Sequence, residues 1–372
     1  MRVLLLSRYD RLGSSSRLRS FQYLDLLRGA EWDVTVSPLL SDEYIERLYA
    51  GRKRQLGDII CGYGQRVLAL LDARKYDIVW IESVLFPWIP KILERILLPA
   101  HIPYILDFDD AVFHRYDMHP WPIVRWGLGR KIDALMRNAA VVVAGNEYIR
   151  ERAFAAGAHH IEILPTVIDL SRYSSTSVTP RAIPVIGWIG TPNTQPHLEV
   201  ASAALCELSR KHAFKVLLVG ADEGAIPTVA HETVEWREDT EVESIRKLDI
   251  GIMPLIESPF AKGKCGYKLI QYMACGLPVV ASPIGINSKL VEHGKNGYLA
   301  NSRETWIEAL SALLSSRELR ATMGAEGRRQ VEAQYSLAAT GPKLLRIMAS
   351  ACTSRHGQTH PIQKVNKTQD QL

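Results

Sequence analysis

Residues 262–282 have the sequence Lys262-Gly-Lys-Cys-Gly-Tyr-Lys-Leu-Ile-Gln-Tyr-Met-Ala-Cys-Gly-Leu-Pro-Val-Val-Ala-Ser282. The segment begins as a glycine-containing loop and continues with the spacing of a short helix, whose Leu269 and Met273 share one face. Gly276 predicts a left-handed end to this helix, and Pro278 prevents it from continuing into the apolar strand that follows. Because the start of a helix offers free N–H groups and a partial positive charge, the segment predicts an anion site.

Three lysines strengthen this prediction. Lys262, Lys264 and Lys268 lie within seven residues of one another, at the expected start of the helix. On these residues alone, a solvated basic loop at the end of an ordinary core helix is the simpler interpretation.

On both sides of this segment, short apolar runs alternate with helix-length amphipathic stretches. Such alternation predicts βαβ units and mostly parallel sheets. The expected strands of the first half are Val3–Leu6, Val34–Ser37, Ile78–Ile81, Tyr104–Asp107, Val141–Ala144 and Ile161–Leu164, with helices that include Leu18–Leu27 and Ile132–Asn138. The expected strands of the second half are Val185–Ile189, Val216–Val219, Val234–Trp236, Ile250–Pro254, Val279–Ala281 and Tyr298–Ala300. Helices are expected at Thr305–Leu314, Arg317–Tyr335 and Pro342–Ala351.

The alternation pauses in a stretch rich in Ser, Thr and Pro, which predicts a linker between two domains. We expect a first domain over 1–170, a linker over 171–184, a second domain over 185–335, a helix over 336–352 that returns to the first domain, and a disordered tail over 353–372. The fold class is α/β, with two Rossmann-like doubly wound domains that face each other across a cleft. Ligands of such sheets bind at the carboxyl ends of the strands, so the cleft is the expected active site.

The bulk composition agrees with two domains. A chain of 372 residues exceeds what one core usually supports. The net charge of +5 is small, which does not favour a nucleic-acid partner. The five cysteines are scattered and form no Cys-x-x-Cys pair, which argues against zinc and for a reducing compartment. No apolar run reaches the length of a membrane span, so we expect a cytoplasmic protein.

The segment Tyr272-Met-Ala-Cys-Gly-Leu-Pro-Val-Val-Ala281 resembles the family 4 glycosyltransferases, which have the GT-B fold. Gly285 and Leu290-Val-Glu-His-Gly-Lys-Asn-Gly-Tyr-Leu299 are similar to the next block of that family, and Pro165-Thr-Val-Ile-Asp169 is similar to the block that closes its first sheet. The resemblance implies transfer of a sugar, with retention, from a nucleotide-diphosphate sugar to an acceptor hydroxyl. It also implies that the first domain, 1–170, binds the acceptor and that the second, 185–335, binds the nucleotide sugar. It implies no metal cofactor, and by analogy a glycan or lipid-linked acceptor in bacterial envelope polysaccharide, exopolysaccharide or glycolipid synthesis.

The chain departs from the family pattern at both motif glutamates. The first falls at Gly263, and the second falls at Gln271. In the family, the first contacts the donor sugar and the second receives the ribose hydroxyls. Gln271 can still exchange hydrogen bonds with a ribose, whereas Gly263 has no side chain to offer. The loop 187–197 also lacks the Arg/Lys pair that holds the diphosphate in the family, and our hypothesis is that Lys264 and Lys268 supply this charge.

Other donor contacts are expected around this segment. Gly190, Thr191, Gly266 and Tyr267 are candidates for the phosphates and the nucleotide, and the edge at Val234–Arg237 is a candidate for the base.

Helix caps are the alternative for several polar residues nearby. Thr194 and Pro196 predict the start of a helix, and this role is compatible with donor contact by Thr191. Asn146 is expected to cap the helix that follows it, although the neighbouring Glu147 also faces the cleft.

In the first domain, Gly13, Ser14, Ser15 and Arg17 form a polar turn that opens a helix. The resemblance implies that this loop faces the acceptor and the donor phosphate, while an ordinary turn between strand and helix is the alternative. The loop does not have the Gly-x-Gly-x-x-Gly pattern, so a dinucleotide cofactor is not expected.

The segment Asp107-Phe-Asp-Asp-Ala-Val-Phe-His114 ends an expected strand at the cleft. Its carboxylates resemble the Asp-x-Asp metal motif of GT-A transferases, but that motif belongs to a different fold, so we expect no metal. We assign Asp109 and Asp110 to the sugar hydroxyls or the acceptor, with a helix cap as the alternative for Asp110. Family members have a histidine in this region that contacts the donor sugar, and His114 is the nearest candidate.

A segment with Trp121, Ile123, Val124, Trp126 and Leu128 mixes apolar residues with the basic residues Arg125, Arg130 and Lys131. Such a helix suits peripheral contact with the inner face of the plasma membrane, and a helix packed on its own sheet has the same pattern. Two other functions also stay open: a non-catalytic GT-B protein that binds a glycan or a partner subunit, and a sugar-nucleotide 2-epimerase.

Overall fold

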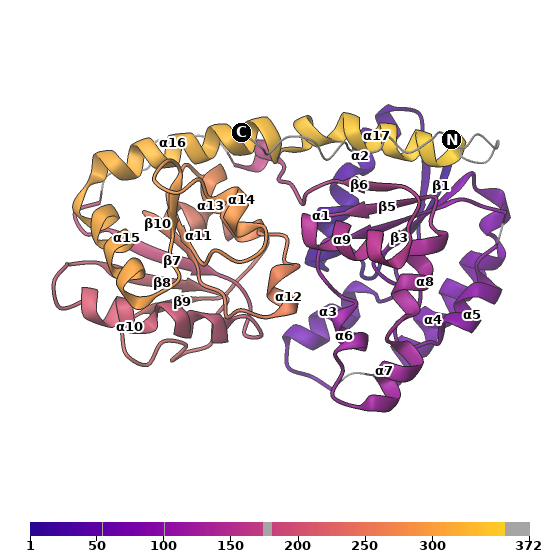
Figure 1. The fold of residues 1–372 in the computed structure, drawn as a ribbon, viewed down its shortest axis with the longest axis horizontal. Helices are drawn as coiled ribbons and strands as arrows, with labels where there is room; N and C mark the ends of the chain where they lie inside the picture. Colours follow the sequence, from indigo (N-terminus) through magenta and orange to yellow (C-terminus); the bar gives the residue numbers. More distant parts are fainter. Residues whose placement is uncertain (54, 100, 174–180, 354–372) are drawn as a thin grey trace, which may run out of the picture.

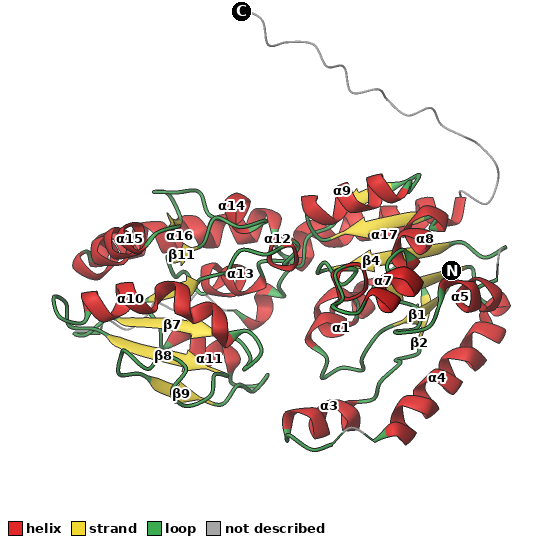
Figure 2. Ribbon diagram, turned by 60° about the horizontal axis from the view of Figure 1, so that its bottom comes forward, coloured by secondary structure: helices red, strands yellow, loops and turns green. Residues whose placement is uncertain are grey.

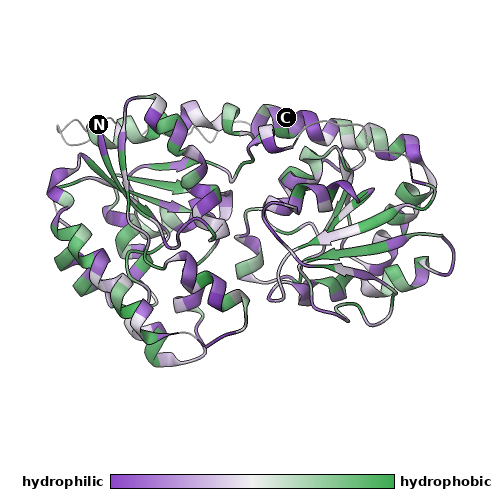
Figure 3. Ribbon diagram, turned by 180° about the vertical axis from the view of Figure 1, so that it is seen from behind, coloured by the Kyte–Doolittle hydropathy of each residue, from purple (hydrophilic) through white to green (hydrophobic). Residues whose placement is uncertain are grey.

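The computed structural model describes residues 1–53, 55–99, 101–173 and 181–353, and within them the chain forms two α/β domains, each built on a parallel sheet (Figure 1). The central strands are buried on both faces, as for Ile78–Glu82 and Val185–Ile189, because helices cover both sides of each sheet. Figure 3 shows mainly hydrophobic residues along these strands.

In the described residues, the first sheet has six strands in the order β2-β1-β3-β4-β5-β6. Their bounds are β1 Arg2–Leu6, β2 Asp33–Val36, β3 Ile78–Glu82, β4 Tyr104–Phe108, β5 Val141–Ala144 and β6 Ile161–Ile163. The helices of this domain are α1 Ser14–Arg19, α2 Leu24–Gly29, α3 Asp42–Tyr49, α4 Leu56–Leu71, α5 Lys91–Leu97, α6 His114–Asp117, α7 Pro122–Leu128, α8 Lys131–Asn138 and α9 Glu147–Ala156.

The second sheet likewise has six strands where the chain is described, in the order β12-β11-β10-β7-β8-β9. Their bounds are β7 Val185–Ile189, β8 Lys215–Val219, β9 Glu232–Val234, β10 Ile250–Met253, β11 Val279–Ala281 and β12 Gly297–Leu299. Its helices are α10 Glu199–Leu208, α11 Glu241–Arg246, α12 Pro259–Lys262, α13 Tyr267–Ala274, α14 Asn287–Leu290, α15 Arg303–Ser315 and α16 Arg317–Gln334. The helix α17, Leu337–Thr353, follows on the side of the first domain.

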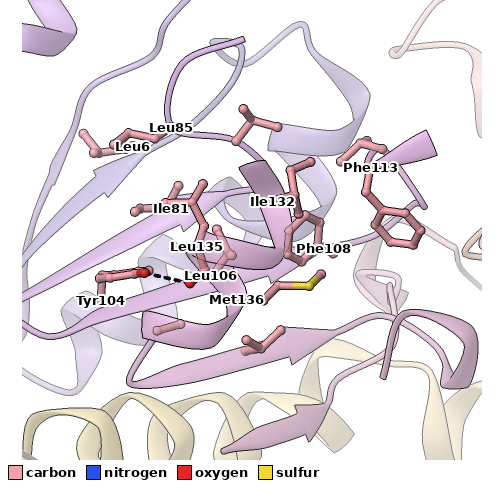
Figure 4. Packing of buried hydrophobic residues seen from close by; sticks show 14 of the residues in the cluster. Leu6, Ile81, Leu85, Tyr104, Leu106, Phe108, Phe113, Ile132, Leu135 and Met136 are labelled. Carbon is pink, nitrogen blue, oxygen red and sulfur yellow. Dashed lines mark hydrogen bonds between the residues drawn. The ribbon is translucent and has the colours of Figure 1, made fainter. Parts of the chain in front are cut away.

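The core of the first domain lies between the sheet and α8 on one side (Figure 4). Leu6, Ile81 and Leu106 of the strands share a buried cluster with Leu135 and Met136 of α8. The Tyr104 hydroxyl donates a hydrogen bond of 2.7 Å to the carbonyl oxygen of Leu135, which satisfies a polar group inside this apolar layer.

The helix α17 covers the opposite face of the first sheet. Leu344, Ile347 and Met348 are buried there against Val3 and Leu5 of β1. Figure 1 shows α16 and α17 in succession along one side of the molecule, so the chain passes from the second domain back to the first between them. The crossover is held by two backbone hydrogen bonds of 3.0 Å, from Ile168 N–H to the Tyr335 carbonyl and from Leu337 N–H to the Ile168 carbonyl.

Three predicted elements differ from the structure. The helix expected over Leu18–Leu27 is divided into α1, a 3₁₀ turn and α2, because the backbone leaves the helical region at Ser20, whose hydroxyl bonds the Ser16 carbonyl oxygen. The strand expected at Val234–Trp236 is β9, two residues earlier, which leaves Trp236 in the loop. The helix α17 begins before Pro342 rather than at it.

Parts of two predicted segments lie outside the described residues, namely 174–180 of the linker and 354–372 of the tail. Among the helices that the structure describes, none combines the length and the apolar character needed to cross a bilayer.

Candidate active site

A cavity of about 220 Å³ lies between the two domains, at the carboxyl ends of strands from both sheets. This is the place where ligands of parallel sheets bind. The first domain contributes Ser14, Ser15, Arg17, Leu18, Asp109, Asp110 and Thr166 to its lining. The second domain contributes Ile189, Gly190, Thr191, Trp236, Glu241, Met253, Lys264, Cys265, Gly266, Tyr267, Lys268 and Gln271.

A larger hollow of about 1080 Å³ lies between α5 and α8. It is lined by Tyr104 and Ala140, at the amino ends of β4 and β5, on the side of the sheet away from the cleft. Since active sites of doubly wound sheets form at the carboxyl ends, we place the candidate active site in the smaller cavity.

The start of α13 forms one wall of the cavity. Gly266 precedes the helix with φ +70°, a left-handed conformation, and a Cβ atom there would lie 2.4 Å from Cδ1 of Leu290. A side chain at this position would therefore be both strained and obstructed. Tyr267 and Lys268 of the first turn line the cavity, so the free N–H groups of the helix start lie beside it. The helix ends as predicted, with Gly276 at φ +72°.

Two lysines give this wall its charge. Among the described residues, neither Lys264 nor Lys268 has a carboxylate within ion-pair distance, although both line the cavity. The Lys268 ammonium lies 4.1 Å from the centre of the Trp188 ring and 3.5 Å from the Thr194 hydroxyl oxygen. Burial, with a smaller contribution from Lys264, lowers the pKa of Lys268 to about 7. A bound anion would favour the charged form of Lys268 and so offset both effects.

The residues beside Lys268 do not compensate its positive charge, whereas Lys264 interacts with the Asp110 carboxylate and favours its ionised form. Burial and the two lysines lower the pKa of His197 to about 4, so this ring is neutral near pH 7. Thr194 precedes a 3₁₀ turn at Gln195–Leu198, as expected, but its side chain makes no cap hydrogen bond. Its hydroxyl oxygen instead accepts a hydrogen bond of 3.1 Å from the Thr191 N–H.

Gln271 lies one turn further along α13 and is 3% exposed. Its side-chain amide donates a hydrogen bond of 3.1 Å to the Tyr173 hydroxyl. That hydroxyl in turn donates to Oε1 of Glu241 at 3.2 Å, and the Trp236 indole N–H donates to Oε2 of Glu241 at 3.1 Å. Gln271 is therefore part of a hydrogen-bonded group that includes a buried carboxylate.

Asp109 and Asp110 stand opposite, at the end of β4. Oδ1 of Asp110 accepts a hydrogen bond of 3.1 Å from the N–H of Cys265, across the cleft. Its role is thus a contact between domains rather than the helix cap considered as the alternative. Burial and the neighbouring Asp109 raise the pKa of Asp110 to about 6.

The loop at Gly263 packs directly on the first domain. The side-chain amide of Asn146 donates hydrogen bonds to the carbonyl oxygens of Gly263 at 2.9 Å and of Lys264 at 3.2 Å. Asn146 also accepts from the Ile149 N–H at 3.0 Å, which confirms the predicted cap. A Cβ atom at Gly263 would lie 2.3 Å from Cβ of Ala111, so glycine permits this close approach.

The first-domain loop is only partly open to a ligand. Ser14 and Ser15 line the cavity, but Gly13 does not, because it packs beneath the side chain of Tyr9. Arg17 lines the cavity and reaches the second domain, where it pairs with Glu238 at 3.2 Å and lies over the Trp236 ring at 5.7 Å. Its charge is therefore compensated before any ligand binds.

His114 is not brought to the cavity. One of its ring nitrogens is 2.9 Å from Asp117, and the other is 2.8 Å from the Tyr148 hydroxyl. Both contacts lie within the first domain. The sequence could not place His114 because it lies beyond the end of β4, in the short helix α6, whose direction depends on packing.

No group of three or more His, Cys, Asp or Glu residues suited to a metal ion occurs in the described part of the chain. The carboxylates of Asp107, Asp109 and Asp110 are divided among separate partners. Asp107 pairs with Arg19 in the interior, and Asp110 accepts from the Cys265 N–H across the cleft.

Comparisons with known proteins agree with this geometry. Residues 183–316 match the family described as Glycosyl transferases group 1. The chain is 26% identical over 234 residues to a D-inositol 3-phosphate glycosyltransferase of Nocardia farcinica. The aligned residues cover 55% of this chain and 50% of that protein. It is 36% identical over 80 residues to spore coat protein SA of Bacillus subtilis, covering 21% of each. The chain thus spans about half the length, or less, of these curated relatives.

Solved structures match over nearly the whole chain. Sucrose-phosphate synthase of Thermosynechococcus elongatus has a TM-score of 0.73 at 14% identity, covering 95% of this chain and all of that one. Anabaena HepE, solved in complex with UDP, has a TM-score of 0.66 at 16% identity, covering 94% and 100%. The protein has the GT-B fold, as predicted. Within its second domain, residues 183–316 are similar to the family described as Glycosyl transferases group 1.

Proposed function

We propose that this protein is a glycosyltransferase that moves a sugar from a nucleotide-diphosphate sugar to an acceptor hydroxyl. The observation that carries the proposal is the pair Lys264 and Lys268, without a carboxylate partner in the described residues, beside the start of α13 in the interdomain cavity. This arrangement suits a diphosphate. The group 1 domain and the relatives named as glycosyltransferases support the same activity.

In this proposal, the second domain stabilises the departing diphosphate. The two lysines and the N–H groups at the start of α13 would balance the charge that develops as the sugar leaves, so the site would need no metal ion. Gln271 and Thr191 would contact the nucleotide, and Asp109 and Asp110 would face the sugar and the acceptor. The contacts of Asp110 with Cys265 and of Asn146 with Gly263 would hold the domains together and exclude water. Retention of configuration is inferred from the family resemblance.

A thermal-shift panel of UDP-, GDP-, ADP- and dTDP-sugars tests donor binding. We expect one donor class to raise the melting temperature of the protein, because ligand that binds only the folded state stabilises it. The double variant Lys264→Ala, Lys268→Ala is the matched control and should lose most of this shift. If no nucleotide sugar stabilises the protein, the proposed function is wrong.

Release of the nucleoside diphosphate in the presence of a membrane extract then tests transfer. Conversion of the donor sugar in the absence of acceptor would instead identify an epimerase. Donor binding with neither reaction would identify a non-catalytic protein.

We further propose a lipid-linked acceptor, reached by contact of the first domain with a membrane. In α7 and just before it, Trp121 and Ile123 are each 67% exposed and Trp126 is 86% exposed. Only the opposite side of α7, with Val124 and Leu128, packs on the core. The alternative of a helix that simply packs on its own sheet does not account for this second apolar side.

The apolar surface extends beyond α7. Ring contacts of 5.8 Å connect Trp121 to His119 and His119 to Trp88, which is itself exposed. The exposed residues Ile92 and Ile96 follow on α5. Figure 2 shows α5 and α4 on the outer flank of the first domain, away from the second domain. Exposed basic residues nearby, namely Lys91, Arg95, Arg125 and Arg130, suit an anionic bilayer.

Co-sedimentation with vesicles that contain anionic lipid tests this contact. We expect the double variant Ile123→Ser, Trp126→Ser to lose vesicle binding while its thermal shift with donor is unchanged. The control is Phe154→Ser, which removes an exposed aromatic residue from α9, outside this surface. Equal binding of all three proteins would refute membrane contact through α7.

A further inference from the structure

Glu241 is a carboxylate in the cavity that the sequence analysis did not single out. It is the first residue of α11 and is 3% exposed, and its side chain lines the same cavity as Lys264 and Lys268. Although two lysines line that cavity, neither pairs with Glu241 in the described residues. The cavity therefore has two lysines beside the start of α13 and, apart from them, the Glu241 carboxylate at the start of α11.

The partners of Glu241 hold it in place without using all of its acceptor positions. Oε1 accepts from the Tyr173 hydroxyl at 3.2 Å and Oε2 from the Trp236 indole N–H at 3.1 Å. The Arg172 guanidinium lies 3.7 Å from Oε1. Since a carboxylate has roughly four acceptor positions on its two oxygens, Glu241 can still accept hydrogen bonds from a ligand.

The distance between Glu241 and the start of α13 suits a nucleotide. The Tyr173 hydroxyl joins Glu241 to Gln271, with contacts of 3.2 Å and 3.1 Å. Gln271 lies four residues beyond Tyr267, which is about 6 Å along a helix axis. A diphosphate at the start of α13 would thus bring the next group of a nucleotide, its ribose, beside Gln271 and Glu241. A vicinal diol supplies two O–H donors, and carboxylates are common partners of ribose hydroxyls in doubly wound domains.

We propose that Glu241 accepts the hydrogen bonds of the ribose diol of the donor nucleotide. The inference rests on the proposed function, and it explains how residue 271 can be an amide. The carboxylate comes from α11 instead, and Tyr173 and Trp236 position it. Gln271 then orients the Tyr173 hydroxyl and contributes to the same pocket.

Calorimetric titration of the full chain with matched ribonucleotide and 2′-deoxyribonucleotide pairs tests the proposal. The pairs are UDP with dUDP, GDP with dGDP, and ADP with dADP. For the base that binds, we expect the ribo form to bind about tenfold more tightly than the deoxy form, which corresponds to roughly one lost charge-assisted hydrogen bond. In Glu241→Gln this preference should fall to less than about threefold.

The deoxy nucleotide separates a ribose contact from a structural role. If Glu241 only supported Trp236 and Tyr173, Glu241→Gln would weaken both members of a pair equally and leave the preference intact, which would overturn the proposal. Glu241→Asp keeps the charge but moves the carboxylate back from the cavity by one methylene group, so it should also reduce the preference. This variant replaces Glu241→Gln in the test if the Gln variant does not fold. Glu243→Gln is the matched control, because Glu243 is exposed on the same helix and does not line the cavity.

A swap of the two side chains gives a gain-of-function test. The double variant Glu241→Gln, Gln271→Glu returns a carboxylate to the other side of the Tyr173 hydroxyl and should recover at least part of the ribo preference. Failure of every ribonucleotide to bind the unaltered protein would refute the proposed function itself. Binding with an unchanged preference in Glu241→Gln would refute only the role of Glu241.

Discussion

The two domains differ in how their buried or cavity-lining cations are paired. In the first domain, Arg19 and Asp107 are almost fully buried, 2% and 1% exposed, and they pair with each other. The Arg19 guanidinium also donates to the Leu164 carbonyl oxygen at 2.8 Å, and the Trp80 indole donates to Asp107 at 3.3 Å. In the second domain, Lys264 and Lys268 face the cavity without a carboxylate partner in the described residues.

This difference separates structural charges from binding charges. A buried charge whose hydrogen bonds are all made by the protein has none left for a ligand, and removing its partner destabilises the fold. A cation that lines a cavity and lacks such a partner lowers the stability of the empty protein. Binding of an anion can restore that stability. Arg17 is intermediate, since Glu238 compensates its charge while its Nε, among the described residues, has no hydrogen-bond partner.

The largest expected effect is on the stability of the first domain. Arg19→Met would leave Asp107 buried without its cation, so we expect the free energy of unfolding to fall by about 3–5 kcal/mol. Urea denaturation measures the change. The control is Arg28→Met, because Arg28 pairs with Asp25 on the surface and should contribute less than about 1 kcal/mol. Similar losses in the two variants would contradict the distinction.

The next effect is on nucleotide binding by the second domain. Lys264→Ala, Lys268→Ala should weaken the binding of the nucleoside diphosphate by about 100-fold, as two charged hydrogen bonds of about 1.5 kcal/mol each are lost. The unfolding free energy should not fall, because two like charges are removed. Lys262→Ala is the control, since Lys262 pairs with Glu257 at 3.1 Å outside the cavity. A lower unfolding free energy with unchanged affinity for the nucleotide would show that these lysines have a structural role.

A smaller effect should appear in the pH dependence of binding. The pKa of Lys268 is lowered to about 7 in the empty site, and a bound diphosphate should raise it. Below about pH 7 the lysine is already charged and affinity is complete, whereas above that pH binding must take up a proton. We therefore expect affinity to fall about fivefold between pH 7 and pH 9, and about tenfold over the whole range, for a rise of about one pKa unit on binding.

Calorimetry in two buffers of different ionisation enthalpy would detect the proton taken up at pH 8. The control is Lys268→Arg, which stays charged over this range and should lose the pH dependence. Binding by the unaltered protein without proton uptake would show that Lys268 does not meet the anion.

The smallest expected effect concerns His114. Its ring contacts Asp117 and Tyr148 rather than the cavity, so His114→Gln should leave the affinity for the nucleotide within about twofold. Loss of these hydrogen bonds should lower the unfolding free energy by about 1 kcal/mol. Titration with the nucleotide sugar and urea denaturation measure both quantities. A tenfold loss of affinity with unchanged stability would instead show that His114 contacts the donor.

Much of the fold followed from the sequence because buried strands and helices have local signals. The strands β5, β7 and β11 occur where the apolar runs predicted them, and Asn146 caps α9 as expected. The break between α1 and α2 had no comparably strong signal. Ser20 can continue a helix or bond a carbonyl one turn back, and the packing of the domain selects the second conformation.

The candidate site was predictable where one segment carries it. Lys264, Gly266, Lys268 and Gln271 lie within eight residues, so α13 and the loop that leads into it bring them to one wall. Glu241 was missed because its neighbours in the sequence carry no signal. It becomes notable only through Tyr173 and Trp236, which come from separate parts of the chain.

The sequence by itself determined the two alternating α/β patterns and the cationic helix start, because periodicity and helix ends depend on residues close in the chain. Only the tertiary structure decided which charges are compensated. Arg17 and Lys268 are alike as isolated basic residues, yet Glu238 pairs with the first and no carboxylate of the described chain pairs with the second. The physical reason is that the pairing of a charge depends on neighbours distant in sequence, which folding alone brings together.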